Sequence, residues 1–356
     1  MKRIFFLPVA ALCFFLWTAA APPALYYASA EGYASSSLRT KLYDIIKGHT
    51  VISYDGLWTL YATTDKTADD KIWDMYSTCS FTYGTKQCGS YSSVCDCYNR
   101  EHSIPKSWFN DASPMYSDAF HVYPTDGKVN GQRSNYPFGE CANGTSLGSK
   151  ALGKLGSSTF TGYSGTVFEP DDEYKGDFAR TYFYMATRYA NICANWGNDV
   201  FGSNNGLTAY AVNLFLKWHR QDPVSLKETD RNDAVYARQR NRNPFIDHPE
   251  LAEYIWGNRV GQSWQAGSAL DESFWEAVEV LPNPASDFVT VKCGSELPVA
   301  YSLFNLAGEL LRQGVTVSGS RISLSMLPSG VYLMQLTIAD RRLMKKIVIA
   351  KSSSGL

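Results

Sequence analysis

The 356-residue sequence has almost no net charge, no long apolar run and no cysteine spacing of the zinc-binding kind. With a formal net charge of −1, the chain offers no overall basic field to attract nucleic acid, so any polyanion site must be local. The apolar run at residues 4–17 is too short for a comfortable membrane span. No CxxC pair occurs with a histidine at the usual spacing, which argues against a structural zinc site.

The N-terminus has the pattern of a secretion signal. Lys2 and Arg3 precede the apolar run, and small residues follow it at positions 18–21. We therefore expect residues 1–21 to be removed, with cleavage after Ala20 or Ala21, or after Ala30 as a second candidate. A membrane anchor is the alternative, and the shortness of the run argues against it.

The cysteines indicate an oxidising destination. Cys13 lies in the expected signal, Cys293 stands alone near the C-terminus, and six others are in the main body. In an exported chain, six cysteines most simply form up to three disulfides, whose connectivity the sequence leaves open. Cys95 and Cys97 would lie on the same side of an extended segment, too far apart to bridge, so they should pair with different partners. The six are Cys79, Cys88, Cys95, Cys97, Cys141 and Cys193.

The length allows two domains, and the first of them has mainly helical patterns. We expect five helices, and in three of them, at residues 37–48, 178–189 and 207–220, apolar residues recur at helical spacing. Residues 72–83 look strand-like toward their end, and residues 141–170 are rich in Gly, Ser and Thr and are expected to be loop. The expected helices are residues 37–48, 178–189, 207–220, 230–242 and 250–256.

Three further patterns carry weak functional signals. Residues 148–154 have the spacing of a phosphate loop, but Leu155 stands where the metal-binding Ser or Thr is needed, so we reject that interpretation. The acidic residues 171–173 could bind calcium, although acids just before a helix more often stabilise its N-terminal dipole. The basic end of the helix at 230–242 could touch phosphates or form a solvated face, and the sequence does not decide between these.

From about Val278 the sequence pattern changes to short segments of alternating apolar and polar residues, separated by Gly, Ser and Pro. Six strands at close spacing predict a small β-sandwich with its own core, in residues 278–356. Its motifs VLPNPASDFVTV, YSLFNLAGELL, LPSGVYLMQL and RLMKKIVIAK resemble the C-terminal sorting domain of type IX secretion cargo. The resemblance implies export across an outer membrane by that machinery, although the tail at 352–356 departs from the usual ending. A carbohydrate-binding or adhesive sandwich is the alternative.

The stretch at residues 98–140 holds the residues best suited to catalysis. Glu101 and His102 are neighbours, so on a strand their side chains point to opposite sides. A neutral histidine can accept a proton from water near pH 7. The carboxylate of Glu101 and the amide oxygen of Asn130 suit Mg²⁺, which needs only one or two protein ligands besides phosphate oxygens. Taken alone, so sparse a set favours a surface glutamate and a structural histidine.

The order of the surrounding motifs adds a resemblance to a known family. REHSIPKSWF at 100–109 and DGKVNGQRSNY at 126–136 are similar to the endonuclease I family, and further blocks extend the likeness over residues 37–257. The resemblance implies a ββα-metal (His-Me) finger and a non-specific nuclease acting on DNA and often RNA, with one divalent cation.

Carried over residue by residue, the family's general base falls on His102, its acidic metal ligand on Glu101 and its amide ligand on Asn130. Mg²⁺ is the expected cation, with Mn²⁺ or Ca²⁺ as alternatives. Arg133 is a candidate phosphate contact, since a guanidinium can grip two oxygens; an ion pair anchoring its helix is the other reading. His121 stands where the family has an asparagine, and we interpret it as a structural hydrogen-bonding residue, as we do the remaining histidines.

These patterns together predict an α+β protein: a signal at 1–21, a mostly helical nuclease domain at 22–277 around the metal finger, and a β-sandwich at 278–356. We expect a monomer without a stable membrane span, secreted or at the cell surface, that cleaves DNA and RNA. Two alternatives stay open. One is a nuclease acting mainly on RNA, and the other is a non-catalytic surface binding module on a nuclease fold, which the many aromatic residues would suit.

Overall fold

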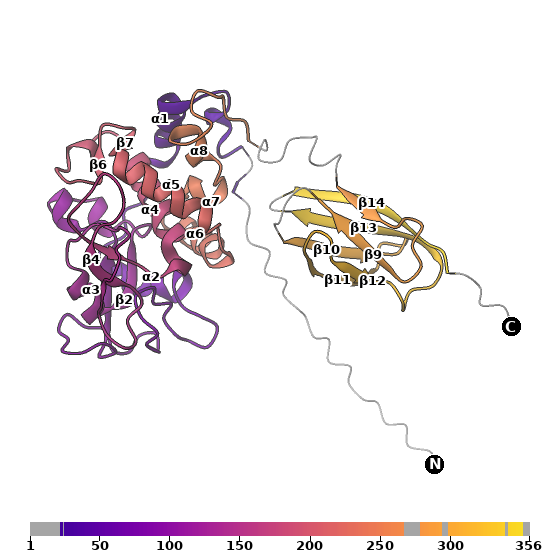
Figure 1. Ribbon diagram of the computed structural model, residues 1–356, viewed down its shortest axis with the longest axis horizontal. Coiled ribbons are helices and arrows are strands. Elements are labelled where there is room, and N and C mark those ends of the chain that lie inside the picture. Colours follow the sequence, from indigo (N-terminus) through magenta and orange to yellow (C-terminus); the bar gives the residue numbers. More distant parts are fainter. Residues whose placement is uncertain (1–21, 24, 267–277, 294–297, 339–340, 352–356) are drawn as a thin grey trace, which may run out of the picture. The chain divides into compact units, whose positions relative to one another are not determined.

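The computed structural model describes residues 22–23, 25–266, 278–293, 298–338 and 341–351. The chain divides into two compact units, residues 1–266 and 267–356, which are distinct in Figure 1. The expected signal at 1–21 and the tail at 352–356 lie outside the described residues. The domain boundary expected at 278 adjoins residues 267–277, which are also outside them, so that boundary stays a prediction.

The first unit is built around one fully buried helix. Every residue of α4 (Lys175–Arg188) is buried, and α1, α5 and α7 pack against it (Figure 1). The other helices bury one face each, as residues three or four apart do. Their bounds are α1 (Ser35–Ile46), α2 (Gly56–Thr64), α3 (Gly127–Arg133), α5 (Ala209–Gln221), α6 (Leu226–Gln239), α7 (Pro244–Asp247) and α8 (Leu251–Ile255). Short 3-10 helices are at Ala28–Ala30, Lys106–Phe109, Met115–Ser117, Asp172–Tyr174 and Cys193–Asn195.

The start of α4 accounts for the acidic triplet. Asp171 caps the 3-10 turn before α4 by accepting from the Glu173 backbone N–H at 3.1 Å, and Asp172 forms an ion pair with Lys175 at 2.6 Å. Acidic side chains stabilise the positive end of a helix dipole. Asp171 and Asp172 are therefore engaged at the start of the helix, as the helix-start interpretation expects.

The strands of the first unit are short, and the first two of them position α3. β1 (Tyr98–His102) pairs antiparallel with β2 (Val122–Asp126), and α3 follows β2 directly, which completes a ββα unit. Two small sheets lie elsewhere in the unit. One consists of β3 (Thr145–Ser146), β4 (Lys154–Ser157) and β5 (Thr166–Glu169), and the other of β6 (Phe201–Gly202) and β7 (Gly206–Leu207).

The second unit consists of two antiparallel sheets with a core of its own. Alternate side chains of its strands, such as Val289, Val291, Leu303 and Met334, are buried together. This alternation is what made its strands predictable from sequence. One sheet has the order β11 (Leu310–Thr316), β10 (Val299–Phe304), β13 (Gly330–Ile338), β14 (Arg341–Ile349), and the other β12 (Arg321–Ser323), β9 (Phe288–Lys292), β8 (Glu279–Leu281).

Two sequence expectations about local structure were wrong. Residues 72–83, expected to be strand-like toward their end, contain only isolated bridges. Near the start of this stretch, the Asp74 carboxylate accepts from the Tyr76 N–H at 2.8 Å and from the Ser77 hydroxyl, which turns the chain. The stretch 141–170, expected to be loop, contains the sheet β3–β5. In the described part of the chain, no helix is both long and apolar enough to span a membrane.

Candidate active site

The ββα unit separates Glu101 and His102 onto opposite faces of β1, as neighbours on a strand must be. On one face, the His102 ring stacks on Tyr54 and Tyr116, with ring centroids 5.6 and 5.2 Å away. On the other face, Glu101 meets Arg133 of α3. Both side chains are buried, His102 with 7% and Glu101 with 2% of its surface exposed. The strand therefore places the two side chains in different chemical environments, one on each of its faces.

His102 is held as a neutral base. Its Nε2 lies 2.9 Å from the Tyr116 carbonyl oxygen, which can only accept, so Nε2 carries the proton and Nδ1 keeps its lone pair. Burial, together with a smaller effect of the nearby His121, lowers the pKa of His102 to about 3, so the ring is neutral at pH 7. A neutral imidazole with a fixed tautomer is the form that can take a proton from water.

Glu101 has one oxygen engaged and one without a donor. Its Oε1 accepts from the Tyr76 hydroxyl at 2.7 Å and from Arg133 Nη1 at 2.8 Å. No hydrogen bond reaches Oε2 from the residues that the structure describes. Burial raises the pKa of Glu101 to about 7 even though both partners favour the anion. A further positive charge beside Oε2 would stabilise the ionised carboxylate.

Arg133 is a buried link between α3 and the end of β1. Only 1% of its surface is exposed, and besides Glu101 it donates to the backbone oxygens of His102 at 2.9 Å and Ser103 at 2.8 Å. The Phe138 ring covers its guanidinium at 4.7 Å. This geometry favours the ion-pair reading of Arg133 over a direct phosphate contact, because both Nη atoms already donate within the protein, and the Nε–H, which has no partner among the described residues, is buried.

Asn130 lies on the same side of α3 as Arg133, three residues before it. Its Nδ2 donates to Asn99 Oδ1 at 2.8 Å, and within the described residues no donor reaches its own Oδ1. Asn99 and Glu101 share a face of β1, so two bonds join this face to α3: Asn99 to Asn130, and Glu101 to Arg133. The site thus offers one carboxylate and one amide oxygen without donors, which are the hard ligands that Mg²⁺ takes.

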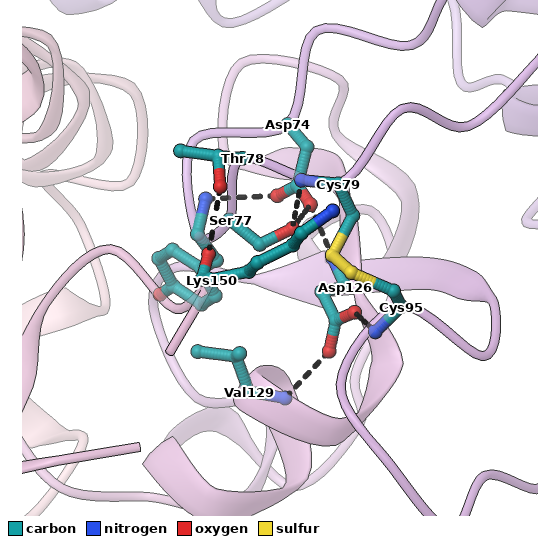
Figure 2. Close-up of a disulfide and its surroundings, with 9 residues drawn as sticks. Asp74, Ser77, Thr78, Cys79, Cys95, Asp126, Val129 and Lys150 are labelled. Carbon is teal, nitrogen blue, oxygen red and sulfur yellow. Dashed lines mark hydrogen bonds between the residues drawn. A yellow bond between two sulfur atoms is a disulfide. The ribbon is translucent and has the colours of Figure 1, made fainter. Parts of the chain in front are cut away.

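A disulfide-braced loop holds the start of α3 (Figure 2). Asp126 caps the helix: its Oδ1 accepts from Val129 N–H at 2.9 Å, and its Oδ2 accepts from Cys95 N–H at 2.7 Å. Gly127 N–H donates to the Cys97 oxygen at 2.9 Å. Both contacts to the loop thus come from disulfide-bonded residues, and they fix the turn that leads to Asn130.

The disulfides partly match expectation. The pairs are Cys79–Cys95 and Cys88–Cys97, so Cys95 and Cys97 do have different partners. Of the up to three disulfides expected in the main body, two are formed, and Cys141 and Cys193 are free thiols, each buried. The Cys79 and Cys95 sulfurs lie near the Asp126 carboxylate, but the disulfide between them leaves no thiolate to bind a metal.

Removing the Cys79–Cys95 disulfide should loosen the helix that carries Asn130. For the double serine variant, we expect the free energy of unfolding to fall by about 2–4 kcal/mol, as for a loop of this length. Thermal unfolding with and without reductant measures it. The single variant Cys141→Ala is the control, since that thiol is unpaired. Equal melting temperatures for the double variant and the wild type would contradict the bracing role.

The other histidines have structural partners. His121 Nε2 lies 2.6 Å from the Met115 oxygen, and His49 Nδ1 accepts from Arg188. The ring of His121 is 5.5 Å from that of His102, and no hydrogen bond joins the two within the described residues. This agrees with a structural role for His121 as a packed neighbour of the candidate base.

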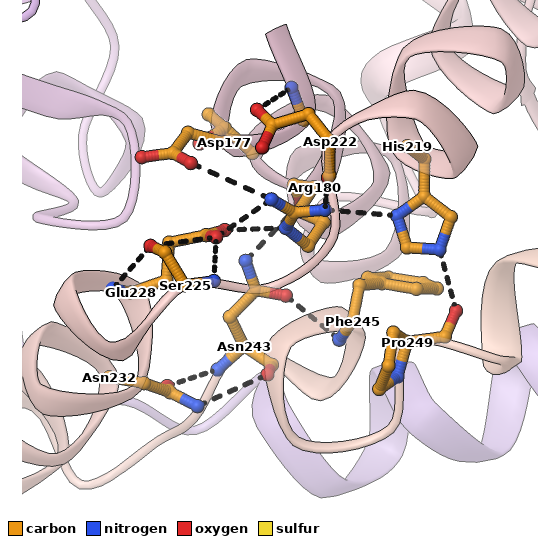
Figure 3. Close-up of polar contacts among 12 residues, drawn as sticks. Asp177, Arg180, His219, Asp222, Ser225, Glu228, Asn232, Asn243, Phe245 and Pro249 are labelled. Atoms are coloured by element: carbon orange, nitrogen blue, oxygen red, sulfur yellow. Dashed lines mark hydrogen bonds and ion pairs between the residues drawn. The ribbon is translucent and has the colours of Figure 1, made fainter. Parts of the chain in front are cut away.

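A second buried polar network lies away from the site (Figure 3). Arg180, fully buried, forms a two-pronged ion pair with Glu228 and donates to the Asp222 backbone oxygen at 2.7 Å. His219 Nε2 donates to the Pro249 oxygen at 2.9 Å, and its Nδ1 faces Arg180 Nη1 at 3.4 Å. The network ties α4, α5 and α6 together, and it requires a neutral His219.

His219 should make the protein sensitive to acid. Burial, together with a smaller effect of Arg180, lowers its pKa to about 4. A depressed pKa means that the unfolded chain takes up the proton first, so stability is lost as the pH falls from about 6.5 toward 4, by up to about 3 kcal/mol. Of the other charged groups near the ring, Glu253 opposes this shift and Arg220 adds to it.

Denaturant unfolding of the wild type and His219→Gln across this pH range measures the effect. Glutamine can donate to the Pro249 oxygen and accept from Arg180 without titrating. The variant should therefore show a smaller loss at low pH. Asp222, whose pKa burial raises to about 6, titrates in both proteins and cancels in the comparison. Parallel pH curves for the two proteins would contradict the role of His219.

Sequence reasoning missed three residues of the site. Tyr54 and Tyr116 both stack on the His102 ring, and Asn99 accepts a hydrogen bond from the Asn130 amide. A signal for Asn99 was present, because a residue two positions before Glu101 on a strand must share its face. Nothing local in the sequence points to Tyr54, which comes from the segment just before α2.

Comparisons with known proteins identify the family to which the first unit is similar. Residues 34–250 match the endonuclease I family. The extracellular ribonuclease of Bacillus amyloliquefaciens is 37% identical over 245 residues, covering 67% of this chain and 80% of that protein. The extracellular ribonuclease of Bacillus subtilis is 35% identical, covering 65% and 78%. A periplasmic deoxyribonuclease of Aeromonas hydrophila is 31% identical over 133 residues, covering 37% and 48%.

The second unit has a match of its own. Residues 279–350 match the secretion system C-terminal sorting domain, so the chain is exported, either secreted or displayed at the cell surface. The match of residues 34–250 covers more than half of the sequence and contains Glu101, His102 and Asn130. The chain therefore belongs to the endonuclease I family.

Proposed function

We propose that this chain is an exported, metal-dependent endonuclease that cleaves DNA and RNA without sequence preference, with His102 as general base. Family membership makes it a hydrolase of phosphodiester bonds. The observation that supports the finer proposal is the arrangement of β1 and α3. It sets a neutral histidine, whose Nδ1 has no partner among the described residues, on one face of β1, and on the other face a carboxylate and an amide that each keep one oxygen without a donor in that part of the chain.

The residues present suit a divalent cation. Glu101 and Asn130 would hold Mg²⁺, or Mn²⁺ or Ca²⁺ in its place, through Glu101 Oε2 and Asn130 Oδ1. Two protein ligands are enough for Mg²⁺, which keeps waters and takes phosphate oxygens for the rest. When bound, such a cation stabilises the negative charge that develops on the phosphate.

His102 carries out the proton transfer in this mechanism. Its Nδ1 accepts a proton from water, while Nε2–H stays on the Tyr116 oxygen and keeps the ring oriented. The oxygen of that water forms a bond to phosphorus, and the bond between phosphorus and the leaving oxygen breaks. Stacking on Tyr54 and Tyr116 limits rotation of the ring, which keeps the base in line for the attack.

A substrate preference for RNA is the second candidate function. The two Bacillus relatives that match about two thirds of the chain are both named extracellular ribonucleases, whereas the deoxyribonuclease matches a shorter part. The proposed mechanism uses water as the nucleophile and does not need the 2′-hydroxyl of RNA, so it does not favour either substrate. The ratio of kcat/KM for RNA and DNA of matched sequence decides between a broad nuclease and one acting mainly on RNA.

Cleavage of covalently closed plasmid DNA and of RNA tests the function. With Mg²⁺ present, we expect nicking of the plasmid, which only an endonuclease can produce, together with degradation of RNA. Excess EDTA should abolish both activities, and added Mg²⁺ should restore them. Cleavage that continues unchanged in EDTA would overturn the metal-dependent mechanism, and intact plasmid and RNA under every divalent cation would favour a binding module. Light scattering checks the expected monomer.

The C-terminal unit is proposed to act only in export. We expect the type IX secretion machinery to recognise it, and the nuclease unit to need no contact with it for activity. The two units have separate hydrophobic cores, which is consistent with independent folding. A chain that ends at residue 266 should therefore keep its nuclease activity when it is produced in an oxidising compartment.

A further inference from the structure

Asn99 was assigned no role by sequence reasoning, yet it is bonded to a proposed metal ligand. It lies on β1, opposite Thr125 of β2 and two residues before Glu101, so its side chain faces α3. There Asn99 Oδ1 accepts from Asn130 Nδ2 at 2.8 Å. Both side chains are half-buried.

This bond decides which end of the Asn130 amide is available. The oxygen and nitrogen ends of an asparagine have the same shape, but only the oxygen can bind a cation. Because Asn99 Oδ1 requires a donor, it takes the nitrogen end and leaves Asn130 Oδ1 without a partner among the described residues. As long as Asn99 presents its oxygen to α3, turning the Asn130 amide over would set two oxygens against each other.

Glu101 shows the same division of labour. Arg133 and Tyr76 both bind its Oε1, and its Oε2 is left without a donor in the described part of the chain. Each proposed ligand therefore has one terminal atom held by the protein and the other free. The Glu101 side of this arrangement depends on Arg133, and the Asn130 side depends on Asn99.

We propose that Asn99 is a positioning residue for the divalent cation: by accepting from Asn130 Nδ2, it presents Asn130 Oδ1 to the metal. This inference rests on the proposed function, in which Asn130 is a ligand. Residues that orient metal ligands typically change metal affinity by about 10–100-fold when they are replaced. Asn99 should affect metal binding in this way without touching metal or substrate.

Two substitutions of nearly equal size separate orientation from packing. Asn99→Leu fills the same space but cannot accept a hydrogen bond. Asn99→Asp can only accept, so it must hold Asn130 by its nitrogen, and its charge also favours a nearby cation. Asn130→Ala removes the proposed ligand itself. Asn135→Leu, at an exposed position two residues beyond α3, makes the same change outside the site.

Electron paramagnetic resonance of Mn²⁺ measures binding without relying on activity, because the signal of the free ion falls as it binds. Asn99→Leu should weaken Mn²⁺ binding by about 10-fold or more. Asn99→Asp should bind at least as tightly as the wild type, and Asn135→Leu should bind equally. In activity assays, Asn99→Leu should need more Mg²⁺ for half-maximal rate and should regain most of kcat when Mg²⁺ is saturating.

The outcomes separate this inference from the proposed function. If Asn130→Ala loses Mn²⁺ but Asn99→Leu binds it like the wild type, the positioning role is wrong and the metal site stands. If Asn99→Asp loses affinity as much as Asn99→Leu does, the acceptor is not what matters, and the role is wrong again. If the wild type binds no Mn²⁺, or if Asn130→Ala binds it normally, both proposals fail. Circular dichroism confirms that each variant is folded.

Discussion

Replacing His102 by alanine is expected to lower kcat by about 10²–10⁴-fold on both DNA and RNA, the usual contribution of a positioned general base. The ring is the only part of His102 that reaches the reacting water in the proposed mechanism. Its backbone, which accepts from Arg133, is unchanged by the substitution. KM and Mn²⁺ binding should therefore change much less than kcat, because the proposed ligands lie on the opposite face of β1.

His219→Gln is the matched control for His102→Ala. His219 is also buried and also has a lowered pKa, but it belongs to the Arg180 network and not to the ββα unit. At pH 7 this variant should keep wild-type activity. If His102→Ala retained more than a tenth of the wild-type kcat while remaining folded, a different group would have to activate the water.

The candidate site was predictable as far as it depends on local order in the sequence. Glu101 and His102 are adjacent, and Asn130 follows within a recognisable block. The resemblance of these two blocks to the family therefore points to all three residues. Strand alternation then separates Glu101 from His102 correctly without any structure. Six strands were expected in the C-terminal unit and correspond to β9–β14, because alternating burial imposes a period of two on the sequence, whereas the three-residue strand β8 was not expected.

What could not be predicted depends on packing between distant segments. Whether Arg133 reaches solvent depends on how α3 packs against β1 and on the Phe138 ring beside the guanidinium. The sequence shows the charge of Arg133 but not its burial. Cys141 and Cys193 had the right chemistry for a third disulfide, but the fold buries each as a free thiol. The turn at residues 74–77 depends on one carboxylate capturing two local donors, which outweighed the strand-like pattern.

Replacing Arg133 by methionine should destabilise the protein by about 3–5 kcal/mol, the cost of breaking a buried ion pair and leaving one partner uncompensated. Methionine keeps the apolar contact with Phe138 but none of the donors. Glu101 would then retain only the Tyr76 hydroxyl, and the backbone oxygen of His102 would lose its bond to the guanidinium. Denaturant unfolding measures the change in free energy.

The same variant decides between the two readings of Arg133. A phosphate contact would raise KM and leave unfolding unchanged. If Arg133 forms a buried ion pair, as the structure favours, its replacement would lower the stability, and it would lower the activity because Glu101 is displaced. Arg238→Met is the control, because Arg238 is exposed on α6 and its loss should change stability by less than about 0.5 kcal/mol. Arg133→Lys keeps the charge with fewer donor directions, so it should lie between the wild type and Arg133→Met. A methionine variant as stable as Arg238→Met but with weakened substrate binding would restore the phosphate-contact reading and require α3 to open in the presence of nucleic acid.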